Sequence, residues 1–226
     1  MQIALFDLDH TLIAFDTGQA WTEFLIRRGH WPAEARETYL DFCRQYVAGT
    51  LDLHAMHRGS VGRLREVPAP TLARWLADFR AELAPRLAPA AHALVARHRE
   101  AGDLCAIVTA TPRFLAEPLA ALFEVPHLLA TESGLDEAGR RTGEIVGEPC
   151  FREGKILHVE RWLARCFGRS LAKVARSWFY SDSASDLPLL QAVSDPVAVG
   201  PDVRLAAHAQ AAGWPVIARP VLPSAP

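Results

Sequence analysis

Residues 3–11 read IALFDLDHT, and this stretch decides the fold. Ile3–Leu8 is a short apolar run that is interrupted by Asp7, a pattern typical of a buried strand that ends in acidic residues. The stretch therefore predicts a strand whose carboxyl end presents Asp7 and Asp9.

From Pro89 onward the sequence alternates between helix and strand patterns. We expect strands over 104–109, 127–131, 177–181, 196–199 and 214–218, helices over 90–100, 112–123, 154–167, 186–193 and 203–212, and a glycine-rich hairpin over 134–149. Strands that alternate with helices predict an α/β fold with a doubly wound, Rossmann-like parallel sheet. Such sheets bind ligands beyond the carboxyl ends of their strands.

A purely helical region separates the first strand from this alternation. Between residues 18 and 87 apolar residues recur at spacings of three and four, as in Trp21, Phe24 and Leu25, which indicates amphipathic helices. At the other end of the chain, the proline-rich segment RPVLPSAP predicts a frayed C-terminus.

The composition excludes several classes of protein. The chain has 226 residues, of which 50% are hydrophobic, and its 24 cations and 26 anions leave a net charge of −2 without a basic block, so we expect no nucleic-acid partner. The N-terminus lacks the basic start of a signal peptide, and no apolar run is long enough to span a membrane. Four widely spaced cysteines predict neither a disulfide framework nor a zinc site. We therefore expect a cytoplasmic protein with no membrane contact.

Lysine is unusually rare in this chain. Of the 24 cations, 22 are Arg, and the two Lys are Lys155 and Lys173. Lys155 lies at the start of an expected helix, where a cation opposes the helix dipole. It is either an ordinary solvent-exposed residue or a compact ammonium kept for a site that a forked guanidinium would not fit, and we favour the second reading.

Three expected strands end in polar residues at the edge where a ligand should bind: Asp7–Thr11, Thr109–Thr111 and Ser181–Asp186. Singly, each segment could be a loop or a helix cap. Together they bring four carboxylates towards one point, namely Asp7, Asp9, Asp182 and Asp186. Like charges so close would repel unless a hard divalent cation neutralised them, so the sequence predicts a Mg²⁺ site beside a phosphate site.

These segments resemble the haloacid dehalogenase-like hydrolases. The motif DLDHT, the strand-ending Thr109, Lys155 and the segment SDSASD occur in the order seen in that family, and particularly in its phosphoserine-phosphatase branch (subfamily IB), which includes bacterial histidinol-phosphatase-like members with SDSxxDLPLL. The resemblance covers nearly the whole chain. It implies a core domain of residues 1–16 and 85–226 and a helical cap domain of residues 17–84.

The resemblance implies a Mg²⁺-dependent phosphatase that works through an aspartyl-phosphate. Asp7 would attack phosphorus, and Asp9 would protonate the leaving alkoxide and then activate water. Asp7, Asp182 and the backbone carbonyl of Asp9 would hold the metal, while Asp186 would order its waters and the cationic partner. The phosphoryl oxygens would be bound by the Thr109 hydroxyl, the backbone N–H of Ala110, and Lys155.

The same resemblance limits the substrate to a small phosphorylated metabolite. Phosphoserine phosphatases hold the substrate amine with an acid that falls at Asp16 here, and the substrate carboxylate with a cap Arg whose ungapped position is Ser60. Arg58 or Arg63 could take that role through a gap. We expect an amino-alcohol phosphate of amino-acid biosynthesis, histidinol phosphate first, with phosphoserine as the alternative, because a buried carboxylate without a cation is costly.

Other readings stay open at this point. A receiver-type signalling module also forms a Mg²⁺-assisted aspartyl-phosphate, but it needs neither the acid at Asp9 nor a large inserted region. A phosphotransferase would share every catalytic residue and differ in its acceptor. Ser185 stands where the family often has Asn, so the resemblance implies no phosphate or metal contact for this position. Both a monomer and a homodimer are compatible with the sequence.

Overall fold

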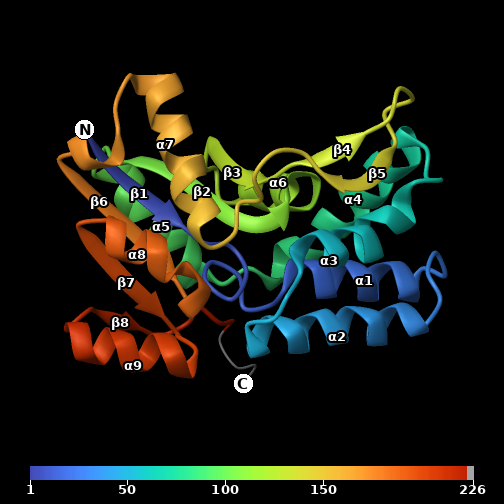
Figure 1. Ribbon diagram of the computed structural model, residues 1–226, viewed down its shortest axis with the longest axis horizontal. Helices are drawn as coiled ribbons and strands as arrows, with labels where there is room; N and C mark the ends of the chain where they lie inside the picture. The colour runs from blue at the N-terminus through green and yellow to red at the C-terminus, as the bar shows by residue number, and fades with distance from the viewer. Residues whose placement is uncertain (223–226) are drawn as a thin grey trace.

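The computed structural model describes residues 1–222 as a parallel sheet with helices on both faces and a helical region beside it (Figure 1). The strands are β1 Gln2–Phe6, β2 Leu104–Pro112, β3 His127–Thr131, β4 Ser133–Leu135, β5 Arg141–Ile145, β6 Arg176–Ser181, β7 Asp195–Val199 and β8 Val216–Ile217. The α-helices are α1 Thr17–Arg27, α2 Glu34–Ala48, α3 Leu53–Ser60, α4 Ala69–Leu83, α5 Pro89–Glu100, α6 Arg113–Leu122, α7 Glu153–Phe167, α8 Leu187–Ala192 and α9 Val203–Ala212. Short 3₁₀ turns cover Val61–Leu64, Ala84–Arg86, Leu171–Lys173 and Ala184–Asp186.

The main sheet is parallel throughout, with the strand order β3-β2-β1-β6-β7-β8. The chain leaves β1 towards β2 on one side and returns through β6 on the other, so the order reverses at β1. A crevice forms beyond the strand ends at such a reversal. The carboxyl ends of β1, β2 and β6 meet there, which confirms the predicted α/β class.

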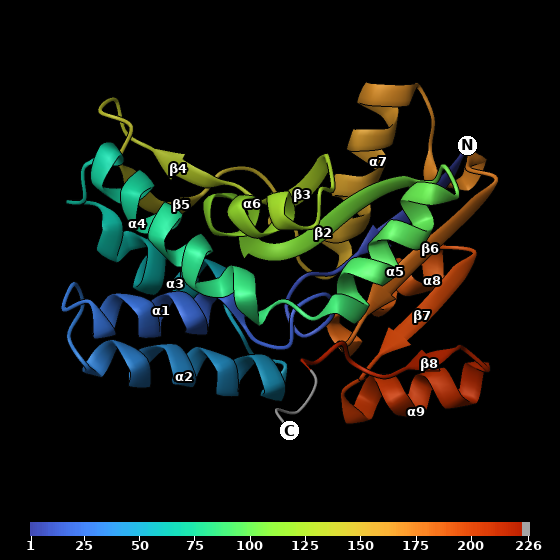
Figure 2. The ribbon, with the colours of Figure 1, turned by 180° about the vertical axis from the view of Figure 1, so that it is seen from behind.

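Alternating side chains of β1 divide the core into two layers. Ala4 and Phe6 pack with one buried cluster, which includes residues of α5 and α6, whereas Ile3 and Leu5 pack with a second, which includes residues of α7, α8 and α9. Both faces are covered, as Figure 2 shows from behind, where α5 crosses in front of the sheet. Burial on both faces explains why β1 is a continuous apolar run. None of the helices in residues 1–222 is long and apolar enough to cross a membrane.

Helices α1 to α4 lie together beside the carboxyl edge of the sheet (Figures 1 and 2). The two-stranded hairpin β4–β5 packs on this group, because Arg65 donates a hydrogen bond to the Thr142 carbonyl (2.7 Å) and Gly62 lies against Gly143. The hairpin thus contacts the helical region, although in the sequence it comes directly after β3 of the main sheet. The division into two domains at residues 16 and 84 stays a prediction.

Most elements end close to the predicted ranges. Helix α3 was not predicted, β2 continues past Thr109 to Pro112 through a shift in its register with β3, and the strand expected over 214–218 is reduced to β8, Val216–Ile217. At the C-terminus, Arg219 is held by a hydrogen bond to the Gly200 carbonyl (3.1 Å), while residues 223–226 of the predicted frayed end lie outside the described residues.

Candidate active site

Lys155 forms the centre of a buried charged cluster. Its ammonium donates hydrogen bonds to Asp7 Oδ1 (2.8 Å) and to Asp186 Oδ2 (2.7 Å), and its side chain is only 3% exposed. Burial alone would lower the pKa of Lys155, but the charges of Asp186 and Asp7 raise it above its ordinary value, so the ammonium keeps its proton. The structure thus places Lys155 between two of the predicted carboxylates rather than in solvent.

The local fold explains how Lys155 reaches the cluster. Helix α7 begins at Glu153, and a Cβ at Gly154 would collide with the carbonyl oxygen of Pro149. Glycine therefore allows the first turn of α7 to approach the preceding segment. Asp186 stands at the N-cap position of α8, yet its carboxylate caps no backbone N–H and instead binds Lys155 and accepts from the Ser181 hydroxyl (2.7 Å).

Asp182 lies next to this cluster. The Thr11 hydroxyl is within 3.2 Å of Asp7 Oδ2 and 3.4 Å of Asp182 Oδ1, and Arg219 approaches Asp182 at 3.6 Å. Burial, together with the charges of Asp7 and Asp186, raises the pKa of Asp182 to about 8. Burial also raises the pKa of Asp7 to about 6, against the opposing effect of Lys155. The cluster therefore holds more negative charge than its own cations neutralise.

Asp9 is held on the other side of the same strand end. Its carboxylate accepts hydrogen bonds from the Thr17 backbone N–H (2.8 Å), the Thr17 hydroxyl and the Thr111 hydroxyl. Burial and the charge of Asp16 raise the pKa of Asp9 to about 7, although these hydrogen bonds oppose the shift. A carboxyl group with such a pKa can both give and take a proton near neutral pH.

The predicted phosphate contacts, Thr109 and Ala110, lie at the carboxyl end of β2. Thr109 is 1% exposed, and its Oγ1 accepts from the Thr111 backbone N–H (3.1 Å), so Thr109 does not cap α6, whose N-cap is Pro112. Thr109 and Ala110 both line the cavity described next.

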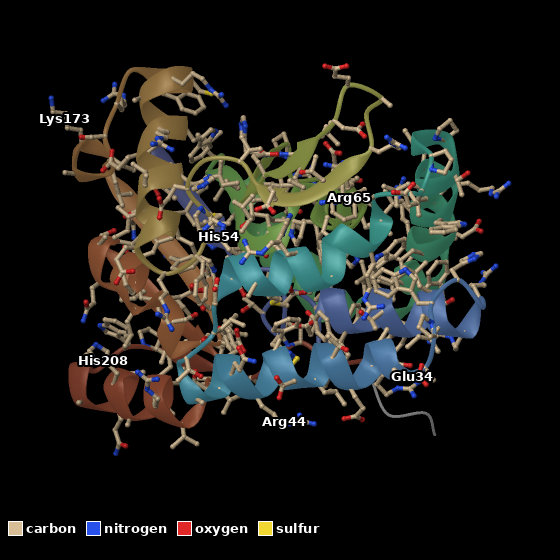
Figure 3. All side chains as sticks on the ribbon, turned by 45° about the vertical axis from the view of Figure 1, so that its right-hand side comes forward. Glu34, Arg44, His54, Arg65, Lys173 and His208 are labelled. Carbon is tan, nitrogen blue, oxygen red and sulfur yellow. The ribbon has the colours of Figure 1, made fainter. Side chains whose placement is uncertain are left out.

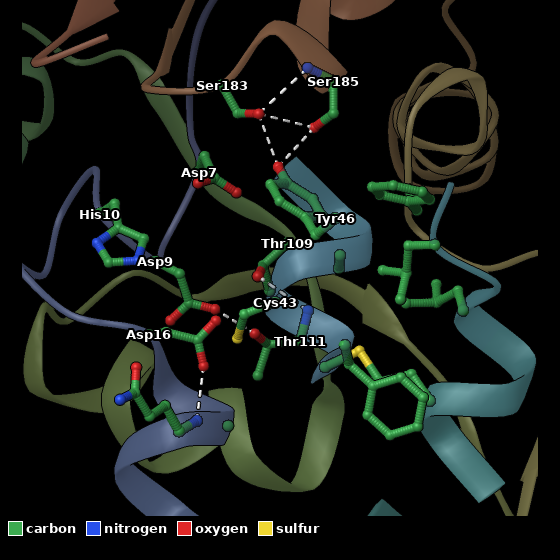
Figure 4. A pocket seen from close by; sticks show the side chains of 18 of the residues that line it. Asp7, Asp9, His10, Asp16, Cys43, Tyr46, Thr109, Thr111, Ser183 and Ser185 are labelled. Atoms are coloured by element: carbon green, nitrogen blue, oxygen red, sulfur yellow. Dashed lines mark hydrogen bonds between the residues drawn. The ribbon is translucent and has the colours of Figure 1, made fainter. Parts of the chain in front are cut away.

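A cavity of about 970 Å³ opens from this strand end towards the helices α1, α2 and α3. All of the predicted site residues except Arg58 line it: Asp7, Asp9, Asp16, Thr109, Ala110, Lys155, Asp182 and Asp186. Figure 4 shows the carboxylates of Asp9 and Asp16 facing the same part of this space. Asp16 also caps α1 through Gln19 N–H (2.6 Å) and accepts from the Tyr39 hydroxyl (2.7 Å).

Arg58 lies outside the cavity. Its guanidinium is 3.6 Å from the Glu144 carboxylate, on the side of α3 that faces the hairpin, and its side chain is 51% exposed. Arg63 is also turned away, since it lies over the Trp31 ring and donates to the Gly59 carbonyl (3.1 Å). Ser60 lines the cavity, as the ungapped register requires, but its hydroxyl donates to the Met56 carbonyl (2.7 Å).

The donors present fit a magnesium ion in part. Within residues 1–222, no group of three or more acidic, His or Cys side chains is arranged to hold a metal ion. The carboxylates of Asp7 and Asp186 instead bind the Lys155 ammonium, and the Asp9 carboxylate accepts hydrogen bonds from Thr17 and Thr111. However, Asp7 and Asp182 share Thr11, and the buried Oδ1 of Asp186 has no hydrogen-bond partner. Excess negative charge, oxygen donors and an orphaned carboxylate oxygen are what a hard divalent ion requires.

Several residues at the cavity were not predicted. Arg219 comes from the C-terminal segment, Thr17 and Thr111 hold Asp9, and Tyr46 binds Ser183 and Ser185. Thr111 lies in the polar strand-end segment that sequence reasoning singled out. Thr17 directly follows Asp16, which the resemblance had placed at the site. Tyr46 and Arg219 come from distant parts of the chain, and no sequence pattern links them to the site.

Comparison with known proteins identifies the family. The model for "haloacid dehalogenase-like hydrolase" matches residues 4–191. The chain belongs to the haloacid dehalogenase-like hydrolase family. A histidinol-phosphatase of Neisseria meningitidis is 38% identical over 95% of this chain and 97% of its own length, and a probable phosphatase of Mycobacterium tuberculosis is 30% identical over 96% and 76%. These relatives and the family show that the enzyme is a phosphatase.

Solved structures support the same assignment of fold. A Bordetella pertussis protein of unknown function is 44% identical, with a TM-score of 0.89 over 96% of this chain and 97% of its own. A phosphoserine phosphatase, solved as an analogue of the phospho-aspartyl intermediate, has a TM-score of 0.68 at 16% identity over 97% and 94%. At this identity, the second likeness concerns the fold of a haloacid dehalogenase-like hydrolase and leaves the substrate open.

Proposed function

We propose that this enzyme hydrolyses a small phosphate monoester by forming an aspartyl-phosphate on Asp7. The observation that carries this proposal is the pairing of two carboxyl groups with different surroundings at one strand end. Asp7 is ion-paired to Lys155, whereas Asp9 is bound by two Thr hydroxyls and has a pKa of about 7. Different surroundings of this kind divide the roles of nucleophile and acid between two neighbouring carboxyl groups.

In the first step, a carboxylate oxygen of Asp7 attacks phosphorus while the bond from phosphorus to the alcohol oxygen breaks. Asp9 gives its proton to that oxygen, so the alcohol leaves neutral. Lys155, the Thr109 hydroxyl and the Ala110 backbone N–H stabilise the charge on the phosphoryl oxygens. In the second step, water attacks phosphorus, Asp9 takes the proton of that water, and the bond to Asp7 breaks to release inorganic phosphate.

Mg²⁺ is the proposed cofactor. The Asp7 and Asp182 carboxylates and the Asp9 carbonyl would hold it, with Asp186 next to it, and the ion would neutralise phosphate charge during transfer. Burial and, after it, the charges of Asp7 and Asp186 raise the pKa of Asp182, and a bound cation would offset both effects, which supports this assignment.

For the substrate, we propose an amino-alcohol phosphate, with histidinol phosphate as the first choice. Asp16 lines the cavity next to Asp9, the proposed acid for the leaving group, and can pair with an ammonium (Figure 4). Among the described residues of segment 17–84, none that lines the cavity is Arg or Lys, and Arg58 and Arg63 both point elsewhere. The arginines that line the cavity are Arg152, Arg204 and Arg219, which come from other segments, so a substrate carboxylate held by segment 17–84 would lack a cation from that segment, which disfavours phosphoserine. The 38% identical relative is a histidinol-phosphatase, which supports the same choice.

We place this reaction in the cytoplasm, as part of amino-acid biosynthesis. Cys43, Cys105, Cys150 and Cys166 are all free in the part of the chain that the structure describes, which fits a reducing compartment.

The test is a comparison of initial rates on histidinol phosphate and phosphoserine with Mg²⁺ at equal enzyme concentration. We expect kcat/KM to favour histidinol phosphate by on the order of 10²-fold, since an unpaired buried charge costs several kcal/mol. A clear preference for phosphoserine would overturn the substrate assignment while leaving the phosphatase chemistry intact. The absence of phosphate release from a panel of phosphate monoesters would overturn the proposed function itself.

A further inference from the structure

The C-terminal end of α2 reaches across the mouth of the cavity to the segment between Asp182 and Asp186. The Tyr46 hydroxyl shares hydrogen bonds with Ser183 Oγ (2.7 Å) and with Ser185 Oγ (2.9 Å), as Figure 4 shows. These contacts join residues that are 137 and 139 positions apart in the sequence. They link the helical region directly to the loop that carries two of the acidic side chains.

That loop is a hydrogen-bonded unit that continues into the charged cluster. The Ser183 backbone N–H donates to Ser181 Oγ (3.2 Å), and the Ser181 hydroxyl donates to Asp186 Oδ2, the same oxygen that binds Lys155. A continuous set of hydrogen bonds therefore runs from Tyr46 to Lys155. A shift of the Tyr46 hydroxyl would therefore displace the Asp186 carboxylate through these hydrogen bonds.

A second contact ties the same end of α2 to the start of α7. Arg152 donates to the Gly49 carbonyl (3.1 Å), just after α2 ends. The backbone of Arg152 has φ 51° and ψ −124°, which a non-glycine residue adopts only when its surroundings hold it there. Arg152 stands three residues before Lys155, so the end of α2 contacts two of the three chain segments that supply the charged cluster, the third being the end of β1 with Asp7.

We propose that Tyr46 is a positioning residue that fixes the Ser183–Ser185 turn and thereby the placement of Asp182 and Asp186. Without the Tyr46 hydroxyl, the turn loses its two side-chain contacts with α2. Ser185, which stands where the family often has Asn, thus acts as a hydrogen-bond partner of Tyr46. The kinetic part of this inference rests on the proposed function.

The test compares Tyr46→Phe, Ser185→Ala and the double variant with wild type on histidinol phosphate. Thr38→Val is the matched control, because Thr38 is on the same helix and its hydroxyl bonds only the Glu34 carbonyl (3.3 Å). Tyr46 is 39% exposed and its hydroxyl bonds two neutral serine hydroxyls, so we expect a loss of the size that ordinary neutral hydrogen bonds give. We expect kcat/KM of Tyr46→Phe to fall about 2- to 12-fold, mainly through KM, with the melting temperature within about 2 °C of wild type.

The remaining readouts separate positioning from a merely structural role. Ser185→Ala should cause no further loss once residue 46 is Phe, and Thr38→Val should leave kcat/KM unchanged. Backbone amides of residues 182–186 should exchange with solvent faster in Tyr46→Phe, whatever the activity of the enzyme. An unchanged kcat/KM and exchange rate in Tyr46→Phe, or losses from Tyr46→Phe and Ser185→Ala that multiply in full, would overturn the inference. If wild type hydrolysed no phosphate monoester, the proposed function would fail, and the exchange rates would decide this inference alone.

Discussion

Replacing Lys155 by Arg tests whether the charged cluster needs a compact ammonium. The lysine side chain is 3% exposed, and its partners Asp7 and Asp186 are 10% and 2% exposed, so the ammonium is closely enclosed by its two carboxylate partners. A guanidinium keeps the charge but is larger and donates in a fixed plane. It cannot occupy the point that is 2.8 Å from one carboxylate and 2.7 Å from the other without displacing at least one of them.

The size of the effect follows from this geometry. Overpacking a buried site costs about 1–3 kcal/mol, which corresponds to roughly 5- to 150-fold if it falls on the transition state. Misplacing one donor to the transition state costs about 10²- to 10³-fold in kcat. We therefore expect kcat of Lys155→Arg to be lower by on the order of 10²-fold.

Lys173→Arg is the matched control, because Lys173 is the other lysine of the chain and is exposed at the periphery of the molecule (Figure 3). The assay is release of inorganic phosphate from histidinol phosphate, with far-UV circular dichroism to show that each variant is folded. Lys173→Arg should keep wild-type kcat. The reasoning is refuted if folded Lys155→Arg retains kcat within about threefold of wild type, since charge alone would then suffice.

Three further predictions concern protons, metal and substrate. Because Asp9 must be protonated to assist the leaving group and has a pKa of about 7, kcat/KM on histidinol phosphate should fall above pH 7. Asp9→Asn should abolish this fall at alkaline pH. If the fall persisted in Asp9→Asn, another group would be the one that titrates. Because folding raises the pKa of Asp182 from 3.8 to about 8, the folded protein binds a proton that the unfolded chain releases, so without metal the free energy of unfolding should fall as pH rises from about 4 to about 8. Mg²⁺ should accordingly stabilise the protein more at pH 8 than at pH 5 in urea titrations, and an equal effect at both values would contradict its placement at Asp182. Asp16→Asn should raise KM for histidinol phosphate by about 10-fold or more while KM for p-nitrophenyl phosphate, which has no ammonium, stays the same.

Local patterns were enough to predict most of the fold. The central strands β1 and β2 are largely apolar runs because both faces of the sheet are buried, and this gives them a clear signal in the sequence. Helix α3 has no such signal, since it is eight residues long and His57 is its one buried residue. The packing of the β4–β5 hairpin on α3 is a contact between distant segments, which periodicity cannot reveal.

The centre of the site was predictable for a topological reason. Parallel strands bring their carboxyl ends to one edge, so Asp7, Thr109 and Asp182 had to lie near one another once the alternation was recognised. The roles of Tyr46 and Arg219 were not predictable, because each depends on how a helix or the C-terminal segment packs over that edge. Arg58 shows the reverse: its position in the sequence suggested a substrate contact, but the β4–β5 hairpin supplies Glu144 as its partner.

The central claim is that Asp7 carries the phosphoryl group during turnover. The most direct measurement is peptide mass spectrometry on Asp9→Asn that has been mixed with histidinol phosphate and Mg²⁺ and quenched in acid, with Asp7→Asn treated in the same way. Without the carboxyl group that activates water, the aspartyl-phosphate should accumulate, so we predict one phosphoryl group on the peptide that contains Asp7 and none in Asp7→Asn, which should also be inactive. Sustained phosphate release by Asp7→Asn, or a phosphoryl group attached to another residue, would contradict the account.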